Sequence, residues 1–171
     1  TLAPRESEPT AQAPPAAQLF AIRGLSFSYD DGPSADAPRG FRLAIDALDL
    51  AAGERLALVG HNGSGKTTLL RILAGLETAL TVQSLVRPPA ARIGFLKQDP
   101  YLFQESAAGN LAFPLRVRRV PAPEIRKRVA ATLALIGLEA SAGRPAAQLS
   151  GGERKRLALG RVLIADPEVL L

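Results

Sequence analysis

The sequence contains no cysteine, no methionine and no tryptophan, and only 5% of its residues are aromatic. Without cysteine, disulfides and thiolate metal sites are excluded. No apolar run is long enough for a membrane-spanning helix. The N-terminus lacks the basic region and apolar run of a signal peptide. An intact gene product begins with Met, so a chain that starts at Thr1 and has no Met is expected to be processed or cut.

The chain is basic, with a net charge of +5 and a pI of about 10.2. That balance is compatible with nucleic acid, acidic lipid or an arginine-rich surface, and charge alone does not choose among them. The densest basic cluster is interpreted as a solvated helix face. The alternative is contact with a partner subunit or anionic lipid. The cluster consists of Arg116, Arg118, Arg119, Arg126, Lys127 and Arg128.

The length of 171 residues corresponds to one domain or part of one, and a 47% hydrophobic content allows a real core. Residues 1–18 are rich in Ala, Pro and Glu and are predicted to be a disordered tail. Residues 19–32 and 41–50 alternate between apolar and polar, which predicts an antiparallel strand pair. The expected inward side chains are Leu25, Phe27, Tyr29, Phe41, Leu43 and Ile45.

Apolar runs and helical periodicity continue along the rest of the chain. They predict strands at 54–60, 91–100 and 167–171, and helices at 66–75 and 122–138. The first of these strands is expected to be buried on both faces. Gly75 and Gly137 are expected to end the two helices. The pattern is that of an α/β fold with an antiparallel piece at the start and a helical insertion near residues 100–148.

The stretch GHNGSGKT, residues 60–67, matches the phosphate-binding pattern G-x-x-x-x-G-K-[ST] between an apolar strand and a helix. Its glycines allow a tight turn that aims backbone N–H groups at phosphate oxygens. Lys66 is predicted to reach the β- and γ-phosphates, and the Thr67 hydroxyl to ligate Mg²⁺. The only histidine, His61, is interpreted as a variable loop position rather than a catalytic group. The candidate nucleotide-binding residues here are Gly60, His61, Asn62, Gly63, Ser64, Gly65, Lys66, Thr67 and Thr68.

A second stretch, LSGGERKRLALGRVL at residues 149–163, begins a helix in an unusual way. Ser150 and Glu153 fit a capping box. Gly151 and Gly152, however, fill the first two helical positions at a cost of about 1 kcal/mol each relative to Ala. Cations follow at the helix end that prefers anions. This arrangement indicates that the helix end has a task besides capping.

The stretch LSGGE, residues 149–153, resembles the signature motif of ABC-type ATPases. Other segments fall where that family has its motifs, over about residues 19–171. Tyr29 resembles the aromatic residue that stacks on adenine, and Gln98 resembles the glutamine of the family's Q-loop. The segment between Gln98 and the signature is similar to the family's helical subdomain. The resemblance implies a phosphate-loop NTPase fold with an N-terminal antiparallel β-subdomain and an inserted helical subdomain.

The resemblance also implies roles for individual residues. In that family two ATPase domains pair head to tail, and the signature of one faces the γ-phosphate held by the other. Ser150, Gly151, Gly152 and Glu153 are then expected to contact nucleotide across the pair. Gln98 is expected to contact Mg²⁺ and the attacking water. The implied catalytic residues are Lys66, Gln98 and Ser150, and the implied metal contacts are Thr67 and Gln98.

Two departures from the family pattern stand out. Residues 76–90 are compact and lack the longer, glycine-containing hairpin of many relatives. The family pattern also continues beyond Leu171 with an Asp for Mg²⁺, a Glu for the attacking water and a His for the γ-phosphate. Residues 19–171 are therefore expected to be a partial ATPase domain, incomplete at the C-terminus, and inactive by itself.

The function indicated is that of an ATP-binding subunit of an ABC transporter, with ATP and Mg²⁺ as ligands. The implied partners are a second ATPase domain and a transmembrane permease at the cytoplasmic face of the membrane, with no direct contact to nucleic acid. An importer is favoured because NLAFPLRVRRV, residues 110–120, resembles importer subunits. The alternatives are a soluble ABC ATPase acting on ribosomes or nucleic acid, and a nucleotide-binding module that does not hydrolyse ATP.

Overall fold

The computed structural model describes residues 18–28, 41–78 and 81–171. The chain divides into two compact units, and each is described by itself. The first unit contains Thr1–Lys66 and Thr78–Arg87. The second contains Thr67–Glu77 and Pro88–Leu171.

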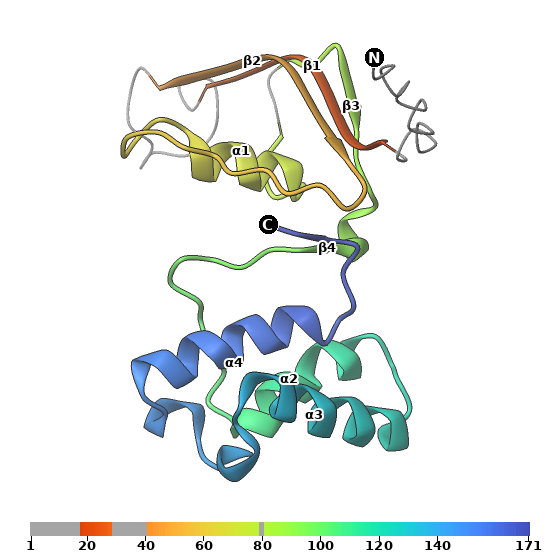
Figure 1. The fold of residues 1–171 in the computed structure, drawn as a ribbon, viewed down its shortest axis with the longest axis vertical. Helices are drawn as coiled ribbons and strands as arrows, with labels where there is room; N and C mark the ends of the chain where they lie inside the picture. The colour runs from red at the N-terminus through yellow and green to blue at the C-terminus, as the bar shows by residue number, and fades with distance from the viewer. Residues whose placement is uncertain (1–17, 29–40, 79–80) are drawn as a thin grey trace, which may run out of the picture. The chain divides into compact units, whose positions relative to one another are not determined.

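The first unit contains an antiparallel sheet (Figure 1). Strand β1 (Gln18–Ser28) lies between β2 (Arg42–Ala51) and β3 (Ser84–Val86). The predicted strand pair is confirmed, and alternate side chains of β1 are buried towards its end because the strand has a core face. The exception is Ser28, which is buried although alternation places it outside. The buried apolar residues of β1 are Phe20, Ala21, Ile22, Leu25 and Phe27.

The prediction of a strand buried on both faces at residues 54–60 is wrong for this structure. The segment forms no ladder with any described residue and is largely exposed. Leu56 is 47% exposed and Val59 is 93% exposed. A strand buried on both faces needs parallel neighbours on both sides and covering layers. The described residues supply none to this segment, so its apolar composition alone does not produce the strand.

Helix α1 (Lys66–Leu73) follows the phosphate-loop pattern directly. Its end is the one expected, because Gly75 adopts φ of 74°. The Gly75 N–H donates to Ile72 O, and the Leu76 N–H donates to Arg71 O. These two bonds form a Schellman motif, which satisfies carbonyls at the helix end.

The second unit carries a short parallel pair, β4 (Ile93–Gly94) and β5 (Val169–Leu170). Further backbone bonds extend the ladder, from Leu96 N–H to Leu171 O and from Glu168 N–H to Arg92 O. Both predicted strands are thus confirmed, although their regular part is shorter than the apolar runs. Gly94 is buried where this ladder passes α4 and Pro167, and a Cβ there would lie 2.5 Å from Val162 Cγ1.

Three further helices pack together in the second unit, which also contains residues 67–73 of α1 (Figure 1). They are α2 (Ala107–Val117), α3 (Ala122–Ile136) and α4 (Gly151–Leu163). Two short 3₁₀ turns, Glu139–Ser141 and Ala146–Gln148, lie between α3 and α4. A third such turn, Ala90–Arg92, precedes β4. Gly137 ends α3 in the left-handed conformation, as predicted. The helices share a core that includes Leu111, Leu115, Leu133, Ile136, Leu149 and Leu157.

Candidate functional site

The phosphate-loop residues form an exposed turn that leads into α1. Gly63 and Gly65 adopt φ of 81° and 89°, a region that side chains with a Cβ rarely enter. A Cβ at Gly65 would also lie 2.9 Å from Phe41 Cζ, whereas one at Gly63 would meet nothing. Glycine is thus needed at Gly63 for the backbone conformation and at Gly65 for both conformation and space.

The Lys66 ammonium folds back over this loop. Its Nζ donates to Gly60 O at 2.8 Å, to His61 O at 2.7 Å and to Ser64 Oγ at 3.3 Å. His61 is exposed, and its ring Nδ1 lies 2.8 Å from Asn62 O. Thr67 is exposed at the first turn of α1, and Thr68 is buried. The loop therefore gathers a cation, a helix start and exposed backbone, a set that fits phosphate and Mg²⁺.

The signature-like stretch begins α4 with the predicted capping box. The Ser150 N–H donates to Glu153 Oε2 at 2.7 Å, and the Glu153 N–H donates to Ser150 Oγ at 3.3 Å. The bond from the Ser150 backbone, followed by the Ser150 hydroxyl and the nearby cations Arg144 and Arg156, lowers the pKa of Glu153. The helix start is therefore well capped from within its own sequence.

The two glycines of this stretch have no packing reason within the described residues. Both are exposed. A Cβ at Gly151 would meet nothing within 4 Å, and one at Gly152 would approach only Arg156 Nη1, at 3.9 Å. Alanine would fit at both positions and would favour the helix. Packing within the described residues therefore does not call for glycine at either position.

Three basic residues, Arg154, Lys155 and Arg156, follow these glycines. Arg156 donates its Nε–H to Ile136 O, at the end of α3. Arg154 and Lys155 are exposed. Arg156 is exposed as well, and its Nη1 lies beside Gly152, so positive charge remains at the helix start.

Gln98 is exposed, two residues after Leu96, the last residue bonded to the β4–β5 ladder. It lies in the second unit together with the signature residues, whereas residues 60–66 of the phosphate loop lie in the first. Tyr29 and the predicted tail up to residue 17 lie outside the described residues.

The basic cluster lies largely at the surface, as its composition predicts, and two of its arginines also have partners within the chain. Arg116 pairs with Glu105 at 2.8 Å, and Arg118 Nη1 donates to Ala165 O at 2.6 Å. Arg119, Arg126 and Lys127 are exposed. Internal acceptors therefore engage part of the charge that sequence reasoning assigned to solvent.

The described ranges contain no group of three or more His, Cys, Asp or Glu side chains suited to hold a metal ion. Within the same ranges, no helix has the length and apolar character needed to cross a membrane.

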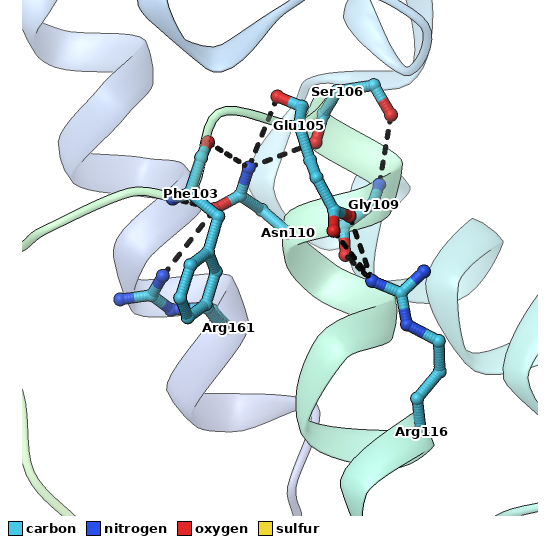
Figure 2. A network of polar contacts seen from close by, with 7 residues as sticks. All are labelled: Phe103, Glu105, Ser106, Gly109, Asn110, Arg116 and Arg161. Carbon is cyan, nitrogen blue, oxygen red and sulfur yellow. Dashed lines mark hydrogen bonds and ion pairs between the residues drawn. The ribbon is translucent and has the colours of Figure 1, made fainter.

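Sequence reasoning missed Asn110 and Arg161. Asn110 is fully buried among apolar residues of α2, and Arg161 contacts it from α4 (Figure 2). A signal existed for Asn110, because a lone Asn at a core-facing position of an apolar helix must find internal hydrogen-bond partners. No local pattern indicated that Arg161 would contact residues about 50 positions away.

Comparison with known proteins covers the phosphate loop and the signature-like stretch together. The family model described as "ABC transporter" matches residues 44–171. The nickel import ATP-binding protein NikO of Rhodobacter capsulatus is 43% identical over 89% of this chain. The lipoprotein-releasing system ATP-binding protein LolD of Chromohalobacter salexigens is 39% identical over 90% of it. The solved structure of cbiO1 from Clostridium perfringens, part of the ABC transporter complex cbiONQ, superposes with a TM-score of 0.74 at 29% identity and 90% coverage of this chain.

The chain spans 64% of the length of NikO and 69% of the length of LolD. It spans 64% of the solved cbiO1 chain.

Proposed function

Because this chain belongs to the ABC transporter family, we propose that it is part of an ATP-binding subunit that uses ATP binding and hydrolysis to drive solute transport. The names of its relatives support this reading, since NikO and LolD are both ATP-binding proteins of transport systems. The expected α/β fold with an antiparallel sheet and a helical bundle supports it as well.

The observation that carries the proposal is the open space at Gly151. Nothing in the described chain lies where its side chain would be. A glycine at the start of a capped helix lets a phosphate approach the backbone N–H groups closely. An open helix start of this kind would suit a nucleotide phosphate that is held by a second ATPase domain.

The phosphate loop would hold the nucleotide of its own chain. In the structure, Lys66 Nζ donates hydrogen bonds to the neutral carbonyl oxygens of Gly60 and His61. An incoming γ-phosphate offers this ammonium a charged acceptor, and bonds of that kind are about twice as strong as neutral ones. Thr67, with Gln98, would hold Mg²⁺, which would neutralise charge that develops on the phosphates. Ser150, Gly151 and Gly152 would bind the γ-phosphate from the partner's side.

The family setting extends the proposal to partners. The subunit would pair head to tail with a second ATPase domain and dock on a transmembrane permease at the cytoplasmic face of the membrane. An importer remains the proposed class, in keeping with the name of NikO. The names of NikO and LolD support a transport role rather than the alternative of a nucleic-acid ATPase.

The substitution Ser150→Arg in the full-length subunit tests the trans arrangement. It should leave ATP affinity of the monomer nearly unchanged in calorimetry, because the phosphate loop is intact. It should abolish the ATP-dependent dimer in light scattering, because a bulky cation replaces the small hydroxyl at the shared site. Loss of ATP binding by the monomer would show that Ser150 serves the nucleotide of its own chain, which contradicts the proposal.

A further inference from the structure

The loop formed by residues 101–106 is held by one buried side chain, that of Asn110 on α2 (Figure 2). Asn110 Oδ1 accepts from the Phe103 N–H at 2.8 Å. Its Nδ2 donates to the carbonyl oxygens of Phe103, Glu105 and Ser106, at 3.1, 3.3 and 3.1 Å. The Asn110 amide is fully buried and cannot bond to water, so without these bonds its polar atoms would be unsatisfied. The bonds therefore fix the course of the loop.

Arg161 ties the same loop to the signature helix α4 (Figure 2). Its Nη2 donates to Tyr101 O at 2.5 Å, and its Nη1 reaches Asn110 Oδ1 at 3.5 Å. The guanidinium carbon also lies 5.1 Å from the centre of the Phe103 ring, a cation–π distance. Burial lowers the pKa of Arg161. Arg161 of α4 thus makes two kinds of contact with the 101–106 loop, and it also reaches Asn110 on α2.

The loop is also joined to the other end of α4. The Ala146 N–H donates to Glu105 O at 2.9 Å. Two residues earlier, Arg144 donates to Gln148 O at 2.7 Å and lies 3.7 Å from Glu153, the capping residue of α4. The 101–106 loop therefore contacts α4 directly near its C-terminal end and, through residues 144–148, at the signature.

We propose that Arg161 is a positioning residue that locks the 101–106 loop to α4, so that a displacement of the loop after Gln98 moves Ser150 with it. The inference rests on the proposed function, in which Ser150 faces the nucleotide of a second domain. Arginine suits this task because its planar fork offers two donors and a face for the Phe103 ring at once. Lysine would keep one charge-assisted bond and lose the fork.

The test compares Arg161→Ala and Arg161→Lys in the full-length subunit. Arg126→Ala on α3 is the control, since it removes an exposed arginine. Amide hydrogen exchange at Glu153 and Arg154 is measured without nucleotide. Steady-state ATP hydrolysis is measured per folded molecule, so that kcat and KM are separated from any loss of stability.

Arg161→Ala should speed exchange at the Phe103 amide and also at Glu153 and Arg154, by about tenfold, the change expected when one bond from a charged donor is lost. It should lower kcat with little change in KM, Arg161→Lys should be intermediate, and Arg126→Ala should match the wild type. Faster exchange confined to residues 101–106, with wild-type rates at Glu153 and Arg154, would overturn the proposal. If the wild type failed to hydrolyse ATP, the proposed function would fail, while the exchange comparison would still decide the coupling.

Discussion

At the scale of single residues, a substitution at Gly151 should affect folding stability and nucleotide binding in opposite directions. Its position has room for a side chain, and alanine is preferred over glycine in helices by up to about 1 kcal/mol. Gly151→Ala should therefore leave thermal stability unchanged or raise it, while it weakens ATP-dependent pairing because a methyl group enters the phosphate's path. Calorimetric melting and light scattering with ATP would measure the two effects.

The matched control for that substitution is Gly143→Ala. Gly143 is also exposed and also has nothing within 4 Å of a Cβ, but it lies outside the signature. Pairing should be unaffected in this variant. Equal pairing by the Gly151→Ala and wild-type proteins would show that the glycine has no role in binding.

Glu153 gives a prediction about pH. Its pKa is lowered in the folded chain, chiefly by the bond from the Ser150 backbone N–H. An unfolded chain then binds more protons in the acid range, so the stabilisation is present above the ordinary Glu pKa and is lost as pH falls through the lowered value. The control is Glu153→Gln, which keeps an acceptor but cannot titrate. The wild type should melt at a higher temperature than this variant near neutral pH, and the difference should disappear as pH falls below the lowered pKa of Glu153. A difference that stays constant from neutral to acid pH would exclude a titrating cap.

At the scale of secondary-structure elements, β4 leaves no room for a side chain at Gly94, where it passes α4. The Cβ position at Gly94 lies 2.5 Å from Val162 Cγ1 and 3.1 Å from Pro167 Cγ, and both neighbours are stiff. Gly94→Val should destabilise the chain by about 1–3 kcal/mol through overpacking. Gly143→Val, at an exposed position, is the control in urea unfolding. Similar midpoints for the two variants would mean that β4 and α4 are less closely packed than the structure shows.

The elements that could be predicted from the sequence are those with local signals. Gly75 and Gly137 end helices because their left-handed conformations are cheap for glycine, and Ser150 with Glu153 starts one through bonds three residues apart. Residues 54–60 failed as a strand because burial on both faces depends on partners distant in sequence. The contacts of Asn110 and Arg161 could not be predicted for the same reason, since their partners come together only in the folded helical unit.

At the scale of the whole molecule, the candidate site residues are shared between two units. Lys66 lies in the first, and Gln98 and Ser150 lie in the second. Motif order along the chain predicts roles for all three residues, but it gave no indication of the contacts between the 101–106 loop and α4. Arg161 makes these contacts within the second unit, to Tyr101 O and to the Phe103 ring.

Both proposals depend on ATP binding at the phosphate loop, and the most direct measurement is calorimetric titration of the full-length subunit with ATP and Mg²⁺. Lys127→Ala on α3 is the control for loss of a lysine. The account predicts that Lys66→Ala weakens binding about tenfold or more, because a bond to a charged group contributes about 1.5–3 kcal/mol. Lys127→Ala should bind as the wild type does. Equal affinity of Lys66→Ala and the wild type would contradict the assignment of residues 60–67 as the nucleotide site.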